Sequence, residues 1–131
     1  MKFNLVPKSE IEKAKFDRQI IHDTAAQVMK DFASFGMNIR FPDDLEYAYD
    51  SLFDQLKIVI SDLLQKNPEK LSSLLYHIDL DERKMKESAK DFPHENEWLS
   101  QLILEREFIK VLTRHYFKNL DDKSKNHPSK I

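Results

Sequence analysis

The chain has 131 residues, with no cysteine, one glycine, and 21 basic against 23 acidic side chains. This length predicts one domain, and the absence of thiols excludes disulfides and thiolate-bound metals. One glycine is too few for phosphate-cradling loops or dinucleotide-binding turns, and the balanced charge lacks the basic excess typical of nucleic-acid-binding domains.

We expect no targeting segment at the beginning of the chain. Residues 1–7 hold one lysine and fewer apolar side chains than the apolar region of a signal peptide requires. No later stretch is apolar enough to predict a membrane span. We therefore expect a cytoplasmic protein that has no membrane partner.

The first predicted helix covers about residues 10–35, because apolar side chains recur along one face of it. Ser9 and Glu12 have the spacing of a capping box at its start. Gly36, the only glycine, follows where a left-handed residue commonly ends a helix.

Two short segments alternate apolar and polar side chains, which is the period of an extended chain. They cover residues 3–6 and 37–41. Neither is long enough for a stable sheet, so we predict extended connectors laid across helices. In the second connector, Met37, Ile39 and Phe41 are predicted to point inward.

Three helices are predicted after the second connector. Residues 45–66 form the first of them, with a clean apolar face. Asn67 as N-cap and Pro68 at the first helical position then predict a short third helix. A fourth short helix, capped by Asp79 or Asp81, is expected to end near residue 91.

The stretch 98–117 predicts a helix that is apolar over most of its circumference, so several neighbours must cover it. We therefore place it at the centre of the fold. At about 100° per residue, Glu105 falls in the middle of the apolar stripe. The polar strip of this helix consists of Ser100, Glu107, Arg114 and Lys118. The side chains predicted to be almost fully buried are Leu52, Leu56, Leu63, Leu102, Ile109 and Leu112.

These elements predict an all-α fold, a compact bundle of about five helices with extended connectors at residues 3–6 and 37–41. Residues 1–119 are expected to form a single helical domain. Residues 120–131 are almost entirely polar, which predicts a disordered tail.

The sequence offers no spacing that predicts a metal site or a catalytic nucleophile. Neither a Glu-x-x-His nor a His-x-x-x-His pair occurs, although metal sites on helices depend on such pairs. No Gly-x-Ser-x-Gly turn is present either. We expect no metal, no cofactor and no catalytic residue.

A helix-turn-helix is a lesser alternative for the third and fourth helices. Four basic residues follow the turn: Arg83, Lys84, Lys86 and Lys90. Four acidic residues in the same helix cancel their charge: Asp81, Glu82, Glu87 and Asp91. Such a mixed run is typical of a solvated helix face, so we expect no nucleic-acid partner.

Glu105 and Arg18 are the two charged side chains that intrude on predicted apolar helix faces. A buried acid can have a raised pKa and transfer protons, but buried charges are normally paired. We favour the structural interpretation, in which a bidentate Arg18–Glu105 pair, or a small network with a tyrosine hydroxyl, joins the first helix to the central one. The alternative is a small-molecule binder or an enzyme with a pocket beside Glu105.

Three segments resemble a known group of proteins: Phe35-Gly-Met-Asn-Ile-Arg-Phe41, Leu74-Leu-Tyr-His-Ile-Asp-Leu-Asp-Glu82 and Ile103-Leu-Glu-Arg-Glu-Phe-Ile-Lys-Val-Leu-Thr-Arg114. They are similar to small uncharacterised helical proteins of Bacteroidetes-type bacteria, over about residues 20–117. The resemblance implies an all-helical fold and a bacterial, cytoplasmic origin. It implies no activity and no site residues.

Phe16, Ile20, Tyr47 and Ile58 are apolar residues that fall outside the predicted core faces. A monomer rarely leaves a large apolar patch bare, so these four residues are the candidate interaction surface. The leading hypothesis is a non-enzymatic interaction or structural module that contacts another protein or a second copy of itself.

Overall fold

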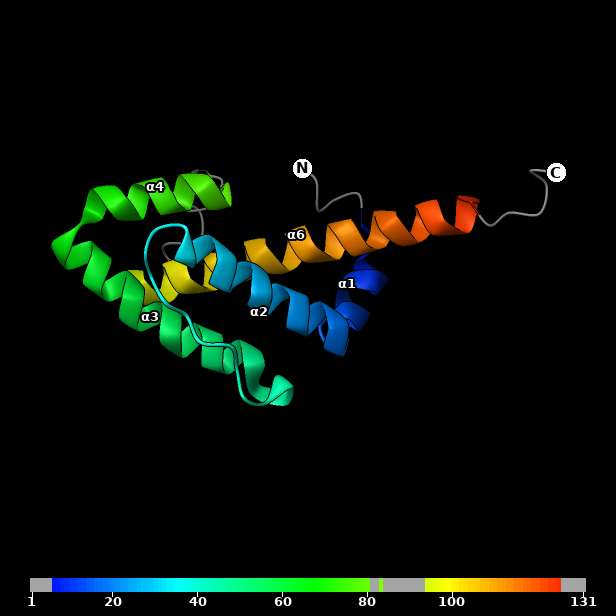
Figure 1. Cartoon of the computed structure of the whole chain (residues 1–131), viewed down its shortest axis with the longest axis horizontal. Helices are drawn as coiled ribbons and strands as arrows, with labels where there is room; N and C mark the ends of the chain where they lie inside the picture. Colours follow the sequence, from blue (N-terminus) through cyan, green and yellow to red (C-terminus); the bar gives the residue numbers. More distant parts are fainter. Residues whose placement is uncertain (1–5, 81–82, 84–93, 126–131) are drawn as a thin grey trace.

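The computed structural model describes residues 6–80, 83 and 94–125, with side chains as far as residue 120. Its elements are α1 (Lys8–Ala14), α2 (Arg18–Ala33), the 3-10 helix η2 (Leu45–Tyr47), α3 (Ala48–Lys66), α4 (Pro68–Ile78) and α6 (Glu95–Lys125) (Figure 1). The predicted all-α class is confirmed, since these residues form helices and connectors with no strand among them.

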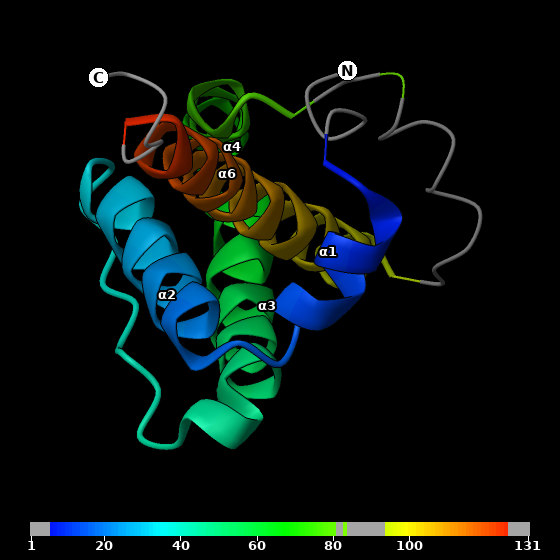
Figure 2. The ribbon, with the colours of Figure 1, turned by 90° about the vertical axis from the view of Figure 1, so that its right-hand side faces the viewer.

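The long helix α6 is the element around which the others gather. α2 and α3 pack along it, and α4 contacts all three of these helices. Figure 2, a view along the length of the molecule, shows α1 lying across α6. The C-terminal part of α6 extends beyond the other helices (Figure 1). The predicted central position of the stretch 98–117 is confirmed.

Two hydrophobic clusters hold the helices together. The larger one lies between α2, α3, α4 and the N-terminal half of α6, and the smaller one joins α1 to α2 and α6. Five of the six side chains predicted to be deeply buried are at most 8% exposed: Leu52, Leu56, Leu63, Leu102 and Leu112. Ile109 is only partly buried, at the edge of the smaller cluster.

The single helix predicted over residues 10–35 is in fact two helices, α1 and α2. The Asp17 carboxylate accepts hydrogen bonds from the N–H groups of Gln19 and Ile20, at 2.9 and 3.1 Å, and so caps a new helix. The predicted capping box is also wrong, because Pro7 precedes α1 and no side chain caps that helix.

The predicted signals at the end of α2 and the start of α4 are confirmed. Gly36 has a φ of 75°, and the Met37 N–H donates to the Phe32 carbonyl at 3.0 Å, which closes a Schellman motif. Asn67 accepts a hydrogen bond from the Lys70 N–H at 3.1 Å, with a proline at the first helical position.

The connector at residues 37–41 is tied to α3 by one glutamine. The Gln55 amide donates to the Arg40 carbonyl at 2.9 Å and accepts from the Arg40 N–H at 2.8 Å, as a neighbouring strand would. Ile39 is buried, as predicted. Phe41 does not point inward as predicted, since it is exposed at the outer end of the connector.

Several predictions lie partly outside the described residues. These are the connector at 3–6 except Val6, which is buried, the fourth helix except Arg83, and the tail from residue 126. α6 continues to Lys125, so the helix extends past the predicted domain boundary at residue 119, and disorder of the tail stays a prediction. No helix within the described ranges is long and apolar enough to cross a membrane.

Candidate functional site

Glu105 and Arg18 do not form the predicted buried pair. Both side chains are exposed, and no ion pair joins these two described residues. Glu105 accepts a hydrogen bond from Gln101 at 3.0 Å. Arg18 is the first residue of α2, so its side chain leaves the end of the helix instead of entering the core.

The buried acid of α6 is Glu107, which the sequence analysis assigned to the polar strip. Its side chain is fully buried, and so is Ser100, two turns earlier on the same strip. The Ser100 hydroxyl donates to the Asn96 carbonyl at 2.7 Å and so has a partner within its own helix. The predicted polar strip is exposed only in its later part, at Arg114 and Lys118.

Glu107 meets Asp31 of α2 in a buried charge cluster. Lys110 Nζ lies 2.9 Å from Glu107 Oε1 and 3.6 Å from Asp31 Oδ2. On its other side, Asp31 Oδ1 accepts a hydrogen bond from Gln27 Nε2 at 3.1 Å and lies 3.3 Å from His77 Nε2 of α4. Side chains from α2, α4 and α6 therefore converge on one carboxylate.

A proton on Glu107 accounts for this geometry. With both acids ionised, Asp31 Oδ2 and both oxygens of Glu107 have no hydrogen-bond donor, since the Lys110 contact is close but not in hydrogen-bonding geometry. Burial raises the pKa of Glu107 to about 8, the hydrogen bond to Asp31 acts in the same direction, and Lys110 opposes both. A pKa of about 8 favours the protonated carboxyl of Glu107 at neutral pH, which is the form that can donate to Asp31.

Asp31 is the ionised partner of the pair. Burial alone would raise its pKa, but hydrogen bonds from Glu107 and Gln27, with the charges of Lys110 and His77, outweigh burial and hold the pKa below its ordinary value. Glu107 has no exposed surface and Asp31 is 4% exposed. The pair therefore joins α2 to α6 in the interior of the fold.

An apolar groove of about 1000 Å³ opens between the α1–α2 turn, the start of α3 and the middle of α6. Its floor consists of the buried side chains Ile21, Leu104 and Phe108. Its charged rim consists of Lys15, Arg18, Glu46, Asp50 and Glu105. The structure thus brings Arg18 and Glu105 to one site, although not into contact.

Three of the four candidate interaction residues are exposed. Phe16 is 83% exposed and lines the apolar groove. Tyr47 and Ile58 are 59% and 73% exposed, and neither lines the groove. The prediction for Ile20 is wrong, because α1 and Val6 cover this side of α2 and bury it in the smaller cluster.

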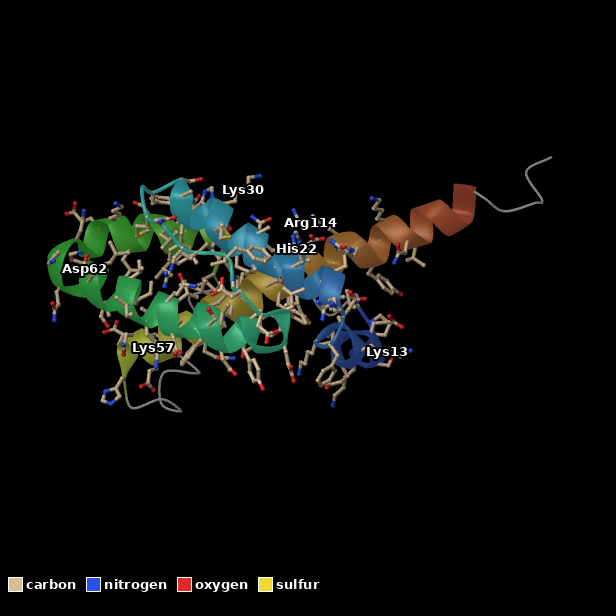
Figure 3. The ribbon with its side chains drawn as sticks, turned by 60° about the horizontal axis from the view of Figure 1, so that its bottom comes forward. Lys13, His22, Lys30, Lys57, Asp62 and Arg114 are labelled. Atoms are coloured by element: carbon tan, nitrogen blue, oxygen red, sulfur yellow. The ribbon has the colours of Figure 1, made fainter. Side chains whose placement is uncertain are left out.

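A polar cleft of about 550 Å³ lies between α2 and α6. Asp23 accepts a hydrogen bond from Gln19 Nε2 at 2.9 Å, and its Oδ2 lies 2.7 Å from His115 Nε2. Burial acts to raise the pKa of Asp23, but hydrogen bonds from His22, His115 and Gln19 hold it below its ordinary value. The cationic lining consists of Lys30, Arg114 and Lys118; Figure 3 labels the first two and His22.

Neither the acid pair nor the contact between Asp23 and His115 was predicted from the sequence. Each of these contacts joins different helices that lie far apart in the chain, so no spacing motif marks them. The only available signal was the position of Asp31, which directly precedes Phe32 on the apolar side of α2.

No protein-family model, curated protein or solved structure matches the chain. The resemblance of its three segments to bacterial helical proteins therefore stays a prediction.

Proposed function

We propose that this protein is a non-enzymatic interaction module whose apolar groove holds an amphipathic helix of another protein. The observation that carries the proposal is Phe16, which is 83% exposed at a groove with an apolar floor. Exposed large apolar side chains beside such a groove are a common mark of a binding surface.

The shape of the groove suits a helix better than a small molecule. The groove, at about 1000 Å³, is at the upper limit of small-molecule sites, and the exposed Phe16 extends its apolar surface beyond the floor formed by Leu104 and Phe108. A helix about 10 Å across, with apolar residues at i, i+3 or i+4, and i+7, can cover the floor and the exposed ring together.

The charges on the rim supply the orientation of the partner. Lys15 and Arg18 come from the α1–α2 turn, whereas Glu46, Asp50 and Glu105 come from η2, α3 and α6. A complementary helix carries acidic residues toward the first group and basic residues toward the second. On this proposal the exposed Glu105 orients the partner and has no part in catalysis.

The test is selection of binders from a display library of amphipathic helical peptides, followed by fluorescence anisotropy. We expect selected helices to carry an apolar stripe flanked by acidic residues on one side and basic residues on the other. Phe16→Asp should weaken their binding at least about tenfold, because it places a charge in the apolar contact. Glu105→Lys should weaken it less, since rim charges contribute less than a desolvated aromatic ring.

Ile58→Asp is the matched control, because Ile58 is equally an exposed apolar residue but lies outside the groove. It should change binding by less than about twofold. Failure to select any helix, or selected helices that tolerate Phe16→Asp, would show the proposal to be wrong. Sedimentation distinguishes self-association: a dimer that Phe16→Asp dissociates would mean that a second copy, not another protein, occupies the groove.

A further inference from the structure

The polar cleft between α2 and α6 is separate from the apolar groove and shares no lining residue with it. Its lining comes from two facing stripes, one on each helix. Gln19, Asp23, Gln27 and Lys30 lie on α2, and Arg114, His115 and Lys118 lie on α6. We propose that this cleft binds a small molecule through a phosphate monoester group.

The charges of the cleft favour an anion. Lys30, Arg114 and Lys118 form no ion pair with any residue whose side chain the structure describes. The one acid, Asp23, is already engaged by His115 at 2.7 Å, His22 at 3.1 Å and Gln19. Three unpaired cations around an occupied carboxylate stand out in a chain whose formal net charge is −2.

Arg114 is held in place by a chain of hydrogen bonds that reaches the buried acid pair. Its Nη2 donates to Gln27 Oε1 at 3.0 Å, and Gln27 Nε2 donates to Asp31 Oδ1 at 3.1 Å. Asp31 is 4% exposed and contacts Lys110 in the core. Because a guanidinium has five donors in a fixed fork, one bond to Gln27 leaves the others available for two phosphate oxygens.

His115 contributes a second fixed group at the cleft. Its Nε2 contact with Asp23 sets the position of the ring. Lys118 follows three residues later on the same helix and lines the same cleft. Arg114, His115 and Lys118 line the cleft together with Lys30, and Arg, Lys and His side chains are the usual donors to a phosphate dianion. Acidic carboxylates are weaker ligands for such a set, because they carry less charge and fewer acceptor oxygens than a phosphate.

The size of the cleft favours an ester over the free ion. Its volume of about 550 Å³ falls in the range of small-molecule sites, about 300–1,000 Å³. A phosphate group held by Arg114 and Lys30 leaves room for the alcohol part of the molecule beside Ala26 and Gln19.

The proposal is tested by NMR titration and calorimetry of the full chain with glycerol phosphate, inorganic phosphate and acetate. Glycerol phosphate should bind saturably, at least as tightly as inorganic phosphate, and shift the signals of Lys30, Arg114 and His115. Lys30→Met and Arg114→Met should each weaken binding about tenfold, as expected for loss of a charge-assisted contact. Acetate should bind at least about tenfold more weakly.

Lys13→Met is the matched control, since it also removes one exposed helical lysine but on α1, away from the cleft (Figure 3). It should change affinity by less than about twofold. Gln27→Met removes no charge and tests the support of Arg114. It should weaken binding about threefold in the wild type but have no effect in an Arg114→Met background, because the two act through one contact.

Three results would overturn the proposal. The first is no saturable binding of glycerol phosphate, and the second is equal loss of affinity in Lys13→Met and Lys30→Met. The third is binding of inorganic phosphate with exclusion of the ester, which would make the ligand a free ion. None of these results bears on the apolar groove, so the two proposals fail independently.

Discussion

Glu105 and Glu107 stand two residues apart on α6 but lie in opposite environments. At about 100° per residue, their side chains point to nearly opposite sides of the helix. Glu105 is exposed at the apolar groove, whereas Glu107 is fully buried against Asp31 of α2. The face of α6 that carries Glu107 is covered by α2, whereas the face that carries Glu105 is open at the groove.

The difference separates two uses of the same functional group. On the covered face, burial raises the pKa of Glu107 to about 8, so a proton becomes part of the packing between α2 and α6. On the open face, the carboxylate of Glu105 is exposed to solvent and is available to the proposed partner helix. A helix that is apolar almost all round can thus use one side for the fold and the other for binding.

The largest expected difference between the two faces concerns isoleucines. Ile103 is fully buried beside Glu107, whereas Ile109 is only partly buried near Glu105. Ile103→Ala should lower the free energy of unfolding by about 2–5 kcal/mol, because it leaves a cavity in the larger cluster. Ile109→Ala should cost less than half as much in the same urea titration. Equal costs would mean that both faces are equally covered.

The second difference is a pH dependence that only Glu107 produces. Its pKa in the fold, about 8, lies above the ordinary value of 4.5. An acid whose pKa is raised by folding stabilises the fold fully when the pH is below its pKa in the unfolded chain. This stabilisation is lost as the pH rises through its pKa in the folded chain. Each pKa unit corresponds to about 1.4 kcal/mol. The free energy of unfolding should therefore fall by several kcal/mol between about pH 5 and about pH 9.

Glu107→Gln should abolish this fall, because glutamine keeps a donor toward Asp31 and cannot ionise. Above about pH 8 the variant should be more stable than the wild type. The lowered pKa of Asp31 produces the opposite pH dependence. Its contribution to the free energy of unfolding is lost as the pH falls below 3.8, the ordinary pKa of an aspartate. This loss of stability at acidic pH should occur in both the wild type and the variant. If the free energy of unfolding of the wild type does not change between about pH 5 and about pH 9, Glu107 is not protonated in the fold.

Lys110→Met should have an intermediate effect on the covered face. It removes the cation that contacts both acids, so the pKa of Glu107 should rise above about 8 and that of Asp31 toward its ordinary value. Loss of this charged contact should cost about 1–3 kcal/mol at neutral pH. The titration is measured by carbon-detected NMR of the side-chain carboxyls.

Lys57→Met is the control for Lys110→Met, because Lys57 pairs with Asp54 at the same i,i+3 spacing, at 3.5 Å. Asp54 is an exposed acid, so the variant should cost less than about 1 kcal/mol. A Glu107 pKa that falls in Lys110→Met would contradict the assigned sign of the contact.

Glu105→Gln should have the smallest effect of all. Glu105 is exposed and its one described contact, with Gln101, survives in part with an amide. The free energy of unfolding should change by less than about 0.5 kcal/mol at every pH. A loss above about 1 kcal/mol would mean that the groove face of α6 is closed within the fold itself.

The amino-acid sequence by itself determined the features that depend on neighbours within a few residues. The Asn67–Pro68 start of α4 and the Gly36 end of α2 were predicted correctly, since caps are satisfied inside one turn of chain. Leucines at helical spacing, such as Leu52 and Leu56, were placed in the core for the same reason.

Only the tertiary structure decided which side of α6 faces inward. Periodicity gives the relative angles of side chains around a helix, but a helix that is apolar almost all round has no single direction to choose. Glu107 was assigned to solvent because the partner that makes its burial tolerable, Asp31, lies on another helix far away in the chain. Ile20 was assigned to the surface because α1, which covers it, was predicted as part of the same helix. Burial is set by which helices meet, and one-dimensional spacing does not contain that information.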